Sequence, residues 1–239
     1  MKALILNSGL GSRMKTLAAD RPKCMTELST GQTIISRQIK QLEDQGICEI
    51  VVTTGPFAEK LEHHTCKAVR SASLFFVNNP LYLATNYIYS IYLAKELLDD
   101  DIVLLHGDLV FASDVLRDIL RFPGSAAVVS TTLPLPQKDF KAVISGGHVS
   151  AIGIEFFTSA VAMQPLYKLN KVDWLIWLAE IEAFIARGDT ACYAENAFNA
   201  VSELCAVFPF DVKNQLCAEI DTPDDLDIVD ALLLRENVK

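Results

Sequence analysis

The residues best suited to chemistry begin with a basic loop at residues 6–23, whose sequence is LNSGLGSRMKTLAADRPK. It gathers two arginines and two lysines in a chain whose net charge is −9. Glycines that follow a strand let backbone N–H groups approach a phosphate closely. Arg13 offers a fork of donors and Lys23 a point charge, so we expect both to face the phosphates of a nucleotide. A plain turn is the alternative, because two glycines alone are a weak signal.

The loop satisfies neither of the two standard phosphate-binding fingerprints. Met14 stands where GxGxxG needs its third glycine, and the GK[ST] ending of a P-loop is absent. A dehydrogenase is also disfavoured, because the second predicted strand ends in Thr and Gly and not in an acidic residue. The glycines of the loop therefore identify no nucleotide-binding class by themselves.

Two aspartates that follow apolar runs are the candidate metal ligands. Asp108 comes after the run LLHG, at the carboxyl end of a predicted strand, where open α/β sheets bind ligands. Asp221 ends a later strand, just before a helix that Thr222-Pro223 begins. Each aspartate has a structural alternative, Asp108 as a turn residue and Asp221 as a helix cap.

The elements that must position these residues alternate between short apolar runs and longer amphipathic ones. The apolar runs do not alternate with polar residues, which favours parallel strands buried on both faces. Strands are expected at 2–7, 49–54, 73–78, 101–107 and 126–132, with helices between them at 33–46, 57–70, 86–99 and 113–121. This order predicts an α/β fold with a doubly wound, mostly parallel sheet.

The pattern changes after residue 132, where we expect a small antiparallel lid region. Gly146-Gly147 suits the tight turn of a hairpin, and residues 163–168 are expected to form a loop over the site. Further elements are expected at 173–187, 205–210, 215–220 and 224–236. We predict one domain over residues 1–239, with a nucleotide-binding half at 1–112 and an acceptor-binding half with the C-terminal helix at 113–239.

The composition argues against several classes of protein. None of the apolar runs in the 239 residues approaches the roughly 18 residues that a membrane span needs. The acidic balance argues against a nucleic-acid partner, which needs a basic face. Six cysteines without metal-like spacing indicate free thiols in a reducing cytoplasm. We expect a cytoplasmic protein without a membrane or nucleic-acid partner, and a monomer or homodimer.

The basic loop resembles the signature of the nucleotidyltransferase (pyrophosphorylase) superfamily, approximately LxxGxGxRxxPxTxxxPK. The matching positions are Gly9, Gly11, Arg13, Pro22 and Lys23. The chain departs from the signature in three places, because Asn7-Ser8 replaces a common Ala-Ala, Thr16 a frequent Pro and Ala18 a frequent Thr. The charged positions are unaffected. The resemblance implies a Rossmann-like, GT-A-like nucleotidyltransferase fold.

The resemblance also implies roles for particular residues. Arg13 and Lys23 would be catalytic, and Asp108 and Asp221 would hold Mg²⁺ together with phosphate oxygens. His106 stands where some members carry a further aspartate, so it is not counted as a ligand. The nucleotide would contact the loop, the helix at 86–99 and one strand end, at Leu6, Asn7, Ser8, Gly9, Leu10, Gly11, Ser12, Asn86, Ser90 and Asp108.

The segment TNYIYSIYLAKE at 85–96 narrows the resemblance. It is similar to a segment of LicC-type choline-phosphate cytidylyltransferases and of 2-aminoethylphosphonate cytidylyltransferases, in which this region lies near the base and ribose. Asn86 and Ser90 are one helical turn apart, so both can face one ligand. The structural alternative is that Asn86 caps a helix with a buried stripe.

The second half supplies candidates for contacts with the acceptor. Trp174 lies three residues before a second tryptophan, and the pair suits either an aromatic cage for a quaternary ammonium or, more commonly, a core. Tyr193 and Glu195 resemble the YWDN stretch of LicC-type enzymes, in which Glu195 would pair with a cationic head group. Lys168 is a candidate for the acceptor's phosphate or a solvated side chain, and Glu155 lies at a strand end.

These features predict a Mg²⁺-dependent cytidylyltransferase that transfers CMP from CTP to phosphocholine or 2-aminoethylphosphonate and releases pyrophosphate. The attacking oxygen is already anionic, so we expect neither a general base nor a covalent intermediate. One alternative is a sugar-1-phosphate nucleotidyltransferase that uses UTP, dTTP or GTP. Another is an inactive, nucleotide-binding regulatory relative, which the presence of all four charged residues disfavours.

Overall fold

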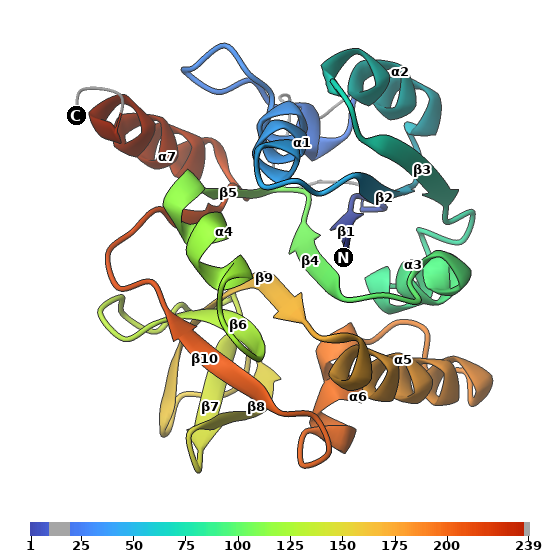
Figure 1. Cartoon of the computed structure of the whole chain (residues 1–239), viewed down its shortest axis with the longest axis vertical. Coiled ribbons are helices and arrows are strands. Elements are labelled where there is room, and N and C mark those ends of the chain that lie inside the picture. Colours follow the sequence, from blue (N-terminus) through green and yellow to red (C-terminus); the bar gives the residue numbers. More distant parts are fainter. Residues whose placement is uncertain (10–19, 237–239) are drawn as a thin grey trace.

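A computed structural model describes residues 1–9 and 20–236, and a large twisted sheet forms its centre (Figure 1). In spatial order the sheet contains β10 (Val207–Asp211), β6 (Ser125–Ser130), β9 (Ala160–Leu169), β4 (Ile102–His106), β1 (Lys2–Leu6), β2 (Glu49–Thr54) and β3 (Ser73–Asn78). A hairpin of β7 (Lys141–Ser145) and β8 (His148–Gly153) joins it through β9.

The strands at the centre of the sheet lie where the unbroken apolar runs predict them. β2 and β3 have the predicted bounds, and β1, β4 and β6 differ from theirs by one or two residues at their ends. β1 pairs in parallel with both β2 and β4, so that Ala3 lies opposite Ile50 and Val103. Because helices cover both faces, nearly all side chains of β1, β2 and β4 are buried. The predicted doubly wound, mostly parallel α/β fold is confirmed.

Residues 163–168 differ from the prediction. They form the middle of β9, which runs antiparallel to both β4 and β6 and places Tyr167 opposite Leu104 and Ala127. Pro165 lies where the register with β6 shifts, and a sheet tolerates proline at such an irregularity because no ladder N–H is needed there. The prediction of a loop over the site is therefore wrong, and this segment belongs to the core.

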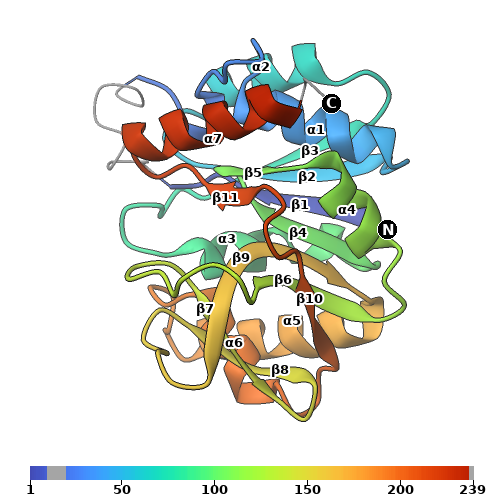
Figure 2. The ribbon, with the colours of Figure 1, turned by 90° about the vertical axis from the view of Figure 1, so that its left-hand side faces the viewer.

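The helices divide between the two faces of the sheet (Figure 2). One face packs against α1 (Ile34–Asp44), α2 (Ala58–Ala68), α4 (Ser113–Leu120) and α7 (Pro223–Glu236), and the other against α3 (Tyr87–Ala94), α5 (Lys171–Ala186) and α6 (Ala194–Val201). Among residues 1–9 and 20–236, 3₁₀ turns cover Lys23–Met25 and Lys95–Leu97. Within the part of the chain described here, every helix is too short or too polar to cross a lipid bilayer.

Local signals in the sequence explain several ends of these elements. Thr33 Oγ1 accepts a hydrogen bond from the Ser36 N–H and caps α1. Gly188 follows α5 with a φ of +91°, a left-handed conformation that favours glycine after a helix. Gly146 and Gly147 also have positive φ values, which lets them form the predicted tight turn between β7 and β8.

A second, two-stranded sheet joins distant parts of the chain next to the large sheet. β5 (Leu109–Phe111) pairs antiparallel with β11 (Cys217–Glu219), and Glu219 lies opposite Leu109. The Ile220 N–H donates a 3.0 Å hydrogen bond to the Asp108 carbonyl. This pairing brings the residues after β11 to the carboxyl end of β4.

Candidate active site

A cavity of about 330 Å³ opens at the carboxyl ends of β1, β3 and β4. This is the edge at which open α/β sheets bind ligands. Its walls come from chain segments that are far apart in sequence, namely residues 6–9, 22–24, 79–87, 106–108, 138–140 and 219–221, with Ile154 and Tyr193. The cavity therefore brings together the basic loop and both predicted metal ligands.

Lys23 lies at the centre of this cavity. Its Nζ donates a 2.6 Å hydrogen bond to Oδ2 of Asp108 and a second, short one to Oδ1 of Asp221. Burial opposes the charge on Lys23, but the two carboxylates outweigh it and raise the pKa of the ammonium. Burial likewise opposes the charge on Asp108, and the nearby Lys23 and His106 outweigh it, which lowers the pKa of that carboxyl.

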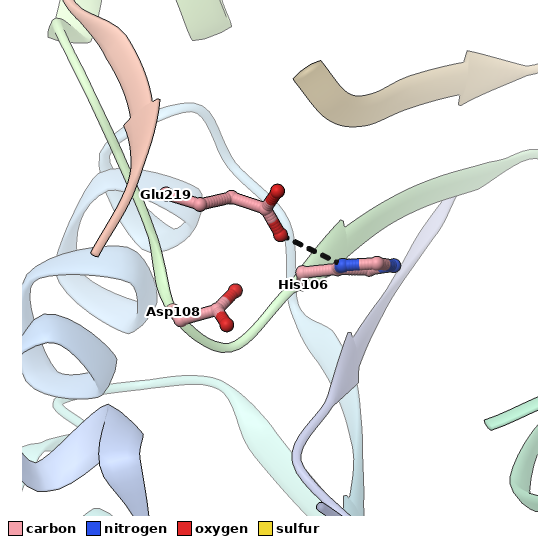
Figure 3. Close-up of side chains that lie close together, drawn as sticks. All are labelled: His106, Asp108 and Glu219. Atoms are coloured by element: carbon pink, nitrogen blue, oxygen red, sulfur yellow. Dashed lines mark hydrogen bonds and ion pairs between the residues drawn. The ribbon is translucent and has the colours of Figure 1, made fainter. Parts of the chain in front are cut away.

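A second group of side chains converges beside Asp108 (Figure 3). His106 Nδ1 lies 3.0 Å from Oε1 of Glu219, and the potential ligand atoms of His106, Asp108 and Glu219 lie within 4.8 Å of one another. Burial and the charge of Asp108 raise the pKa of Glu219 to about 7. Burial disfavours the charged form of His106, but the bond to Glu219 outweighs it and raises the pKa of the imidazole.

This donor set fits a hard divalent cation. The carboxylates of Asp108, Asp221 and Glu219 supply oxygen ligands of the kind that Mg²⁺ prefers. Oδ1 of Asp108 is buried and has no hydrogen-bond partner among the described residues, which leaves that atom for a ligand. Sequence reasoning missed Glu219, although Glu219 and Asp221 are two residues apart, a spacing that places side chains on one face of a strand.

Four rings form a closed circuit in the cavity wall, and we call them the aromatic set. They are Tyr87, His106, Phe140 and Tyr193. Successive centroids are separated by 4.9 Å from Tyr87 to His106, 6.4 Å to Phe140, 5.1 Å to Tyr193 and 5.9 Å back to Tyr87. Of the predicted acceptor contacts, Tyr193 is the one that lines the cavity.

Glu195 lies behind the aromatic set and does not line the cavity. It is 1% exposed, and it accepts a 2.7 Å hydrogen bond from the Tyr167 hydroxyl and a short one from the Tyr87 hydroxyl. Burial, followed by the charge of Glu195, raises the pKa of both tyrosines, which keeps them as donors. The prediction of a direct contact with the acceptor is corrected, because Tyr87 stands between Glu195 and the cavity.

Three further acceptor candidates also lie away from the cavity. Trp174 is fully buried and donates through Nε1 to the Leu98 carbonyl at 2.9 Å, so it belongs to the core. Lys168 is buried in β9, where it donates to Asn170 Oδ1 at 2.6 Å and to a backbone carbonyl at 2.9 Å. Glu155 follows β8, outside the cavity wall. The predictions for Trp174 and Lys168 are corrected, because contacts in the core and beside the strand hold these side chains away from the cavity, whereas the role of Glu155 stays a prediction.

The predicted nucleotide contacts fall into three groups. Leu6, Asn7, Ser8, Gly9, Asn86 and Asp108 line the cavity. Ser90 is fully buried and accepts a 3.0 Å hydrogen bond from Asn79, so it supports the wall without forming it. Asn86 also caps α3, because its Oδ1 accepts from the Tyr87 N–H at 2.7 Å. Leu10, Gly11, Ser12 and Arg13 lie outside the described residues.

Several curated proteins are similar to about half of the chain. A CMP-5'-(3-aminopropyl)phosphonate synthase of Streptomyces rubellomurinus is 32% identical over 55% of this chain and 21% of its own length. A CTP:phosphoglutamine cytidylyltransferase of Campylobacter jejuni is 30% identical over 54% of this chain and 52% of its own. The choline-phosphate cytidylyltransferase of Streptococcus pneumoniae is 31% identical over 51% of this chain and 51% of its own length. The matched part thus spans about half of these relatives' length or less.

Solved structures share the fold over nearly the whole chain. The CTP:phosphocholine cytidylyltransferase LicC from Streptococcus pneumoniae superposes with a TM-score of 0.78 at 21% identity, covering 97% of this chain and 98% of its own. An inositol-1-phosphate CTP transferase from T. maritima superposes with a TM-score of 0.77 at 18% identity, covering 95% of this chain and 94% of its own. Residues 3–153, more than half of the chain, match the MobA-like NTP transferase domain. The chain is therefore a nucleotidyltransferase and belongs to the MobA-like NTP transferase family.

Proposed function

We propose that the protein is a Mg²⁺-dependent cytidylyltransferase that transfers CMP from CTP to a small acceptor and releases pyrophosphate. The acceptor carries a phosphate or phosphonate at one end and a cationic nitrogen at the other. One observation carries this proposal: the aromatic set adjoins the Lys23–Asp108–Asp221 cluster in one cavity. The similarity to three enzymes that act on phosphonates, phosphoglutamine and phosphocholine supports it.

In this reaction the protein positions the two substrates and neutralises the charge of the phosphates. The acceptor oxygen is anionic and attacks the α-phosphorus of CTP, and pyrophosphate leaves. A Mg²⁺ ion held by Asp108 and Asp221, with Glu219 beside them, would supply charge neutralisation at the phosphates. Lys23 holds phosphate oxygens through its ammonium, which its carboxylate partners keep charged. We assign the same role to Arg13.

The aromatic set suits the cationic end of the acceptor. Faces of Tyr and Phe attract an ammonium group through their π-electrons, and the ring of Tyr193 lies 5.9 Å from that of Tyr87 and 5.1 Å from that of Phe140, centroid to centroid. Glu219 adds a carboxylate at the edge of the set, next to His106. This composition favours phosphocholine or 2-aminoethylphosphonate over a sugar 1-phosphate, whose recognition needs many hydrogen bonds.

The remaining parts of the proposal concern the whole chain. We propose that residues 1–239 form one nucleotidyltransferase domain, because strands from both halves belong to one sheet. We also propose that it works in the cytoplasm as a monomer or homodimer. The six cysteines, each a free thiol, fit a reducing compartment.

A pyrophosphate-release assay tests the proposal directly. Each of CTP, UTP, dTTP and GTP is combined in turn with phosphocholine, 2-aminoethylphosphonate and a panel of sugar 1-phosphates, with and without Mg²⁺. We expect turnover with CTP and an amine-bearing acceptor, and the more active of the two names the acceptor. Turnover with UTP or dTTP and a sugar phosphate would contradict the cytidylyl assignment. Nucleotide binding without turnover of any acceptor would point to the regulatory relative.

A further inference from the structure

The end of β1 carries two buried polar atoms that the rest of the described chain leaves without a partner. Asn7 Nδ2 and Ser8 Oγ are both buried, and neither forms a hydrogen bond to any described residue. Leaving a buried donor unpaired destabilises a fold, so such atoms call for an explanation. Both residues line the cavity, which makes a bound ligand the natural partner.

Two glycines provide the space that the Asn7 side chain and the Ser8 backbone occupy. A Cβ atom added at Gly107, after β4, would lie 1.7 Å from Oδ1 of Asn7. A Cβ atom at Gly55, after β2, would lie 2.4 Å from the Ser8 carbonyl oxygen. The strands on either side of β1 thus end in glycines, and a larger residue at either place would force Asn7-Ser8 to move. The amide of Asn7 is therefore closely packed by its neighbours while its donor stays unpaired.

The chemistry of Asn7 differs from that of the rest of the cavity. The phosphates of a nucleotide need positive charge, which Lys23 supplies, and a cationic acceptor needs π-faces, which the aromatic set supplies. A nucleobase is neutral and presents a planar edge of donors and acceptors. A carboxamide matches such an edge, and asparagine is used to read bases in this way elsewhere. Asn7 therefore suits the base.

We propose that Asn7 discriminates cytosine from uracil by donating a hydrogen bond from Nδ2 to N3 of the pyrimidine ring. N3 of cytosine carries a lone pair and accepts this bond. N3 of uracil carries a hydrogen, so two donors would face each other. The proposal rests on the proposed function, since it assumes that CTP is the nucleotide, and it assigns the choice of base to a side chain of this chain.

The test measures the binding of CMP and UMP by isothermal titration calorimetry, without acceptor. These monophosphates share ribose and phosphate, so the ratio of their dissociation constants isolates the base. We expect the wild type to prefer CMP. Asn7→Ala should lose roughly 3- to 10-fold in affinity for CMP, the range of one neutral hydrogen bond, and should bind UMP at least as well as the wild type does.

A second variant keeps the shape of the side chain and inverts its chemistry. Asn7→Asp presents an acceptor where the wild type presents a donor, so the preference should shift towards UMP beyond the value for Asn7→Ala. The added negative charge weakens both nucleotides alike and cancels in the ratio. Asn214→Ala removes an exposed amide far along the chain and serves as the matched control, with the wild-type ratio expected.

The outcomes separate this inference from the proposed function. An unchanged CMP-to-UMP ratio in both Asn7 variants would overturn the inference, whatever the turnover assay gives. A changed ratio together with no turnover of any acceptor would uphold the inference and overturn the proposed transfer reaction. Thermal melts of each variant show that it is folded, so that a loss of binding reports on the contact.

Discussion

The ammonium of Lys23 lies 2.6 Å from Oδ2 of Asp108 and bonds Asp221 as well, so one cation bridges both proposed metal ligands. Against the effect of burial, the nearby ammonium lowers the pKa of the Asp108 carboxyl, which keeps that group ionised at the end of the sheet. It also places the positive charge where phosphate oxygens would approach the carboxylates. The same three residues therefore govern the electrostatics of this part of the cavity.

Replacing Lys23 with alanine should reduce turnover far more than nucleotide binding. The removal of a preorganised cation from a buried site lowers kcat by roughly 100- to 1,000-fold in comparable enzymes. Steady-state kinetics with CTP and the best acceptor measure kcat, and calorimetry measures CTP affinity. Lys60→Ala, an exposed lysine that bonds the Asp20 carbonyl, is the control and should keep wild-type rates. Equal losses in the two variants would remove Lys23 from its assigned role.

The carboxylates should differ in what they contribute to metal binding. Asp108→Asn and Asp221→Asn each remove a proposed ligand, so both should weaken Mn²⁺ binding and lower activity by roughly 100-fold or more. Electron paramagnetic resonance of free Mn²⁺ counts the bound metal independently of turnover. Asp224→Asn removes an exposed acid in the first turn of α7 and should leave both readouts unchanged. Full metal binding by Asp221→Asn would assign the second carboxylate to Glu219.

Glu195→Gln should affect the acceptor through Tyr87 and leave the nucleotide alone. The amide keeps the shape of the side chain but bonds the two tyrosine hydroxyls less strongly, which loosens the wall formed by Tyr87. We expect the KM for the acceptor to rise roughly 3- to 10-fold with the KM for CTP unchanged. Tyr167→Phe removes the bond on the core side only, so it should lower the melting temperature without changing the acceptor KM. If Glu195→Gln raised the KM for CTP as much as the KM for the acceptor, the assignment of Glu195 to the acceptor side of the cavity would be wrong.

Glu43 should make a large contribution to stability against acid, far from the cavity. Its carboxylate is 1% exposed and accepts bonds from the backbone N–H groups of residues 70–72 and from the Arg70 side chain. Burial opposes its charge, but these bonds lower the pKa from 4.5 to about 2. A depressed pKa stabilises the fold fully above pH 4.5, and the contribution disappears as the pH falls through 2.

Glu43→Gln tests that contribution. The shift corresponds to about 3 kcal/mol, so the variant should lose roughly 2–3 kcal/mol of unfolding free energy at pH 7. The difference from wild type should shrink between pH 4.5 and 2, as urea titrations at several pH values would show. Asp44→Asn removes an exposed partner of the same arginine and should cost about 1 kcal/mol or less. A pH-independent difference for Glu43→Gln would contradict the assignment.

The sequence predicts the buried parallel strands well because their physical signal is local. Runs such as IVLL at 102–105 are apolar throughout, and a strand covered on both faces needs that. β9 escapes this reasoning, since Gln164 and Pro165 interrupt its apolar run and only the partner strands show that an irregularity accommodates them. A strand that forms because distant strands pair with it, as β9 does, has no comparable local pattern in the sequence.

The candidate site shows the same division. Asp108 and Asp221 can be found from residue type and position after predicted strands, and Lys23 from the charge of the basic loop and its resemblance to the family signature. The direction in which Trp174 and Glu195 point depends on which helix face packs on the sheet, and both side chains turn inward. Their aromatic and acidic character alone does not distinguish the cavity from the core, because tyrosine hydroxyls can satisfy a buried carboxylate as well as a ligand can.

The pairing of β5 with β11 determines when, during synthesis of the chain, the charged centre can form. Lys23 precedes Asp108 by 85 residues and Asp221 by 198, and Asp221 reaches the cavity through β11. A chain emerging from the ribosome therefore carries the complete family match at 3–153 well before its last carboxylate is synthesised. The growing chain cannot assemble this charged centre until β11 and Asp221 have left the exit tunnel, so the segment that matches the family model cannot complete the centre on its own.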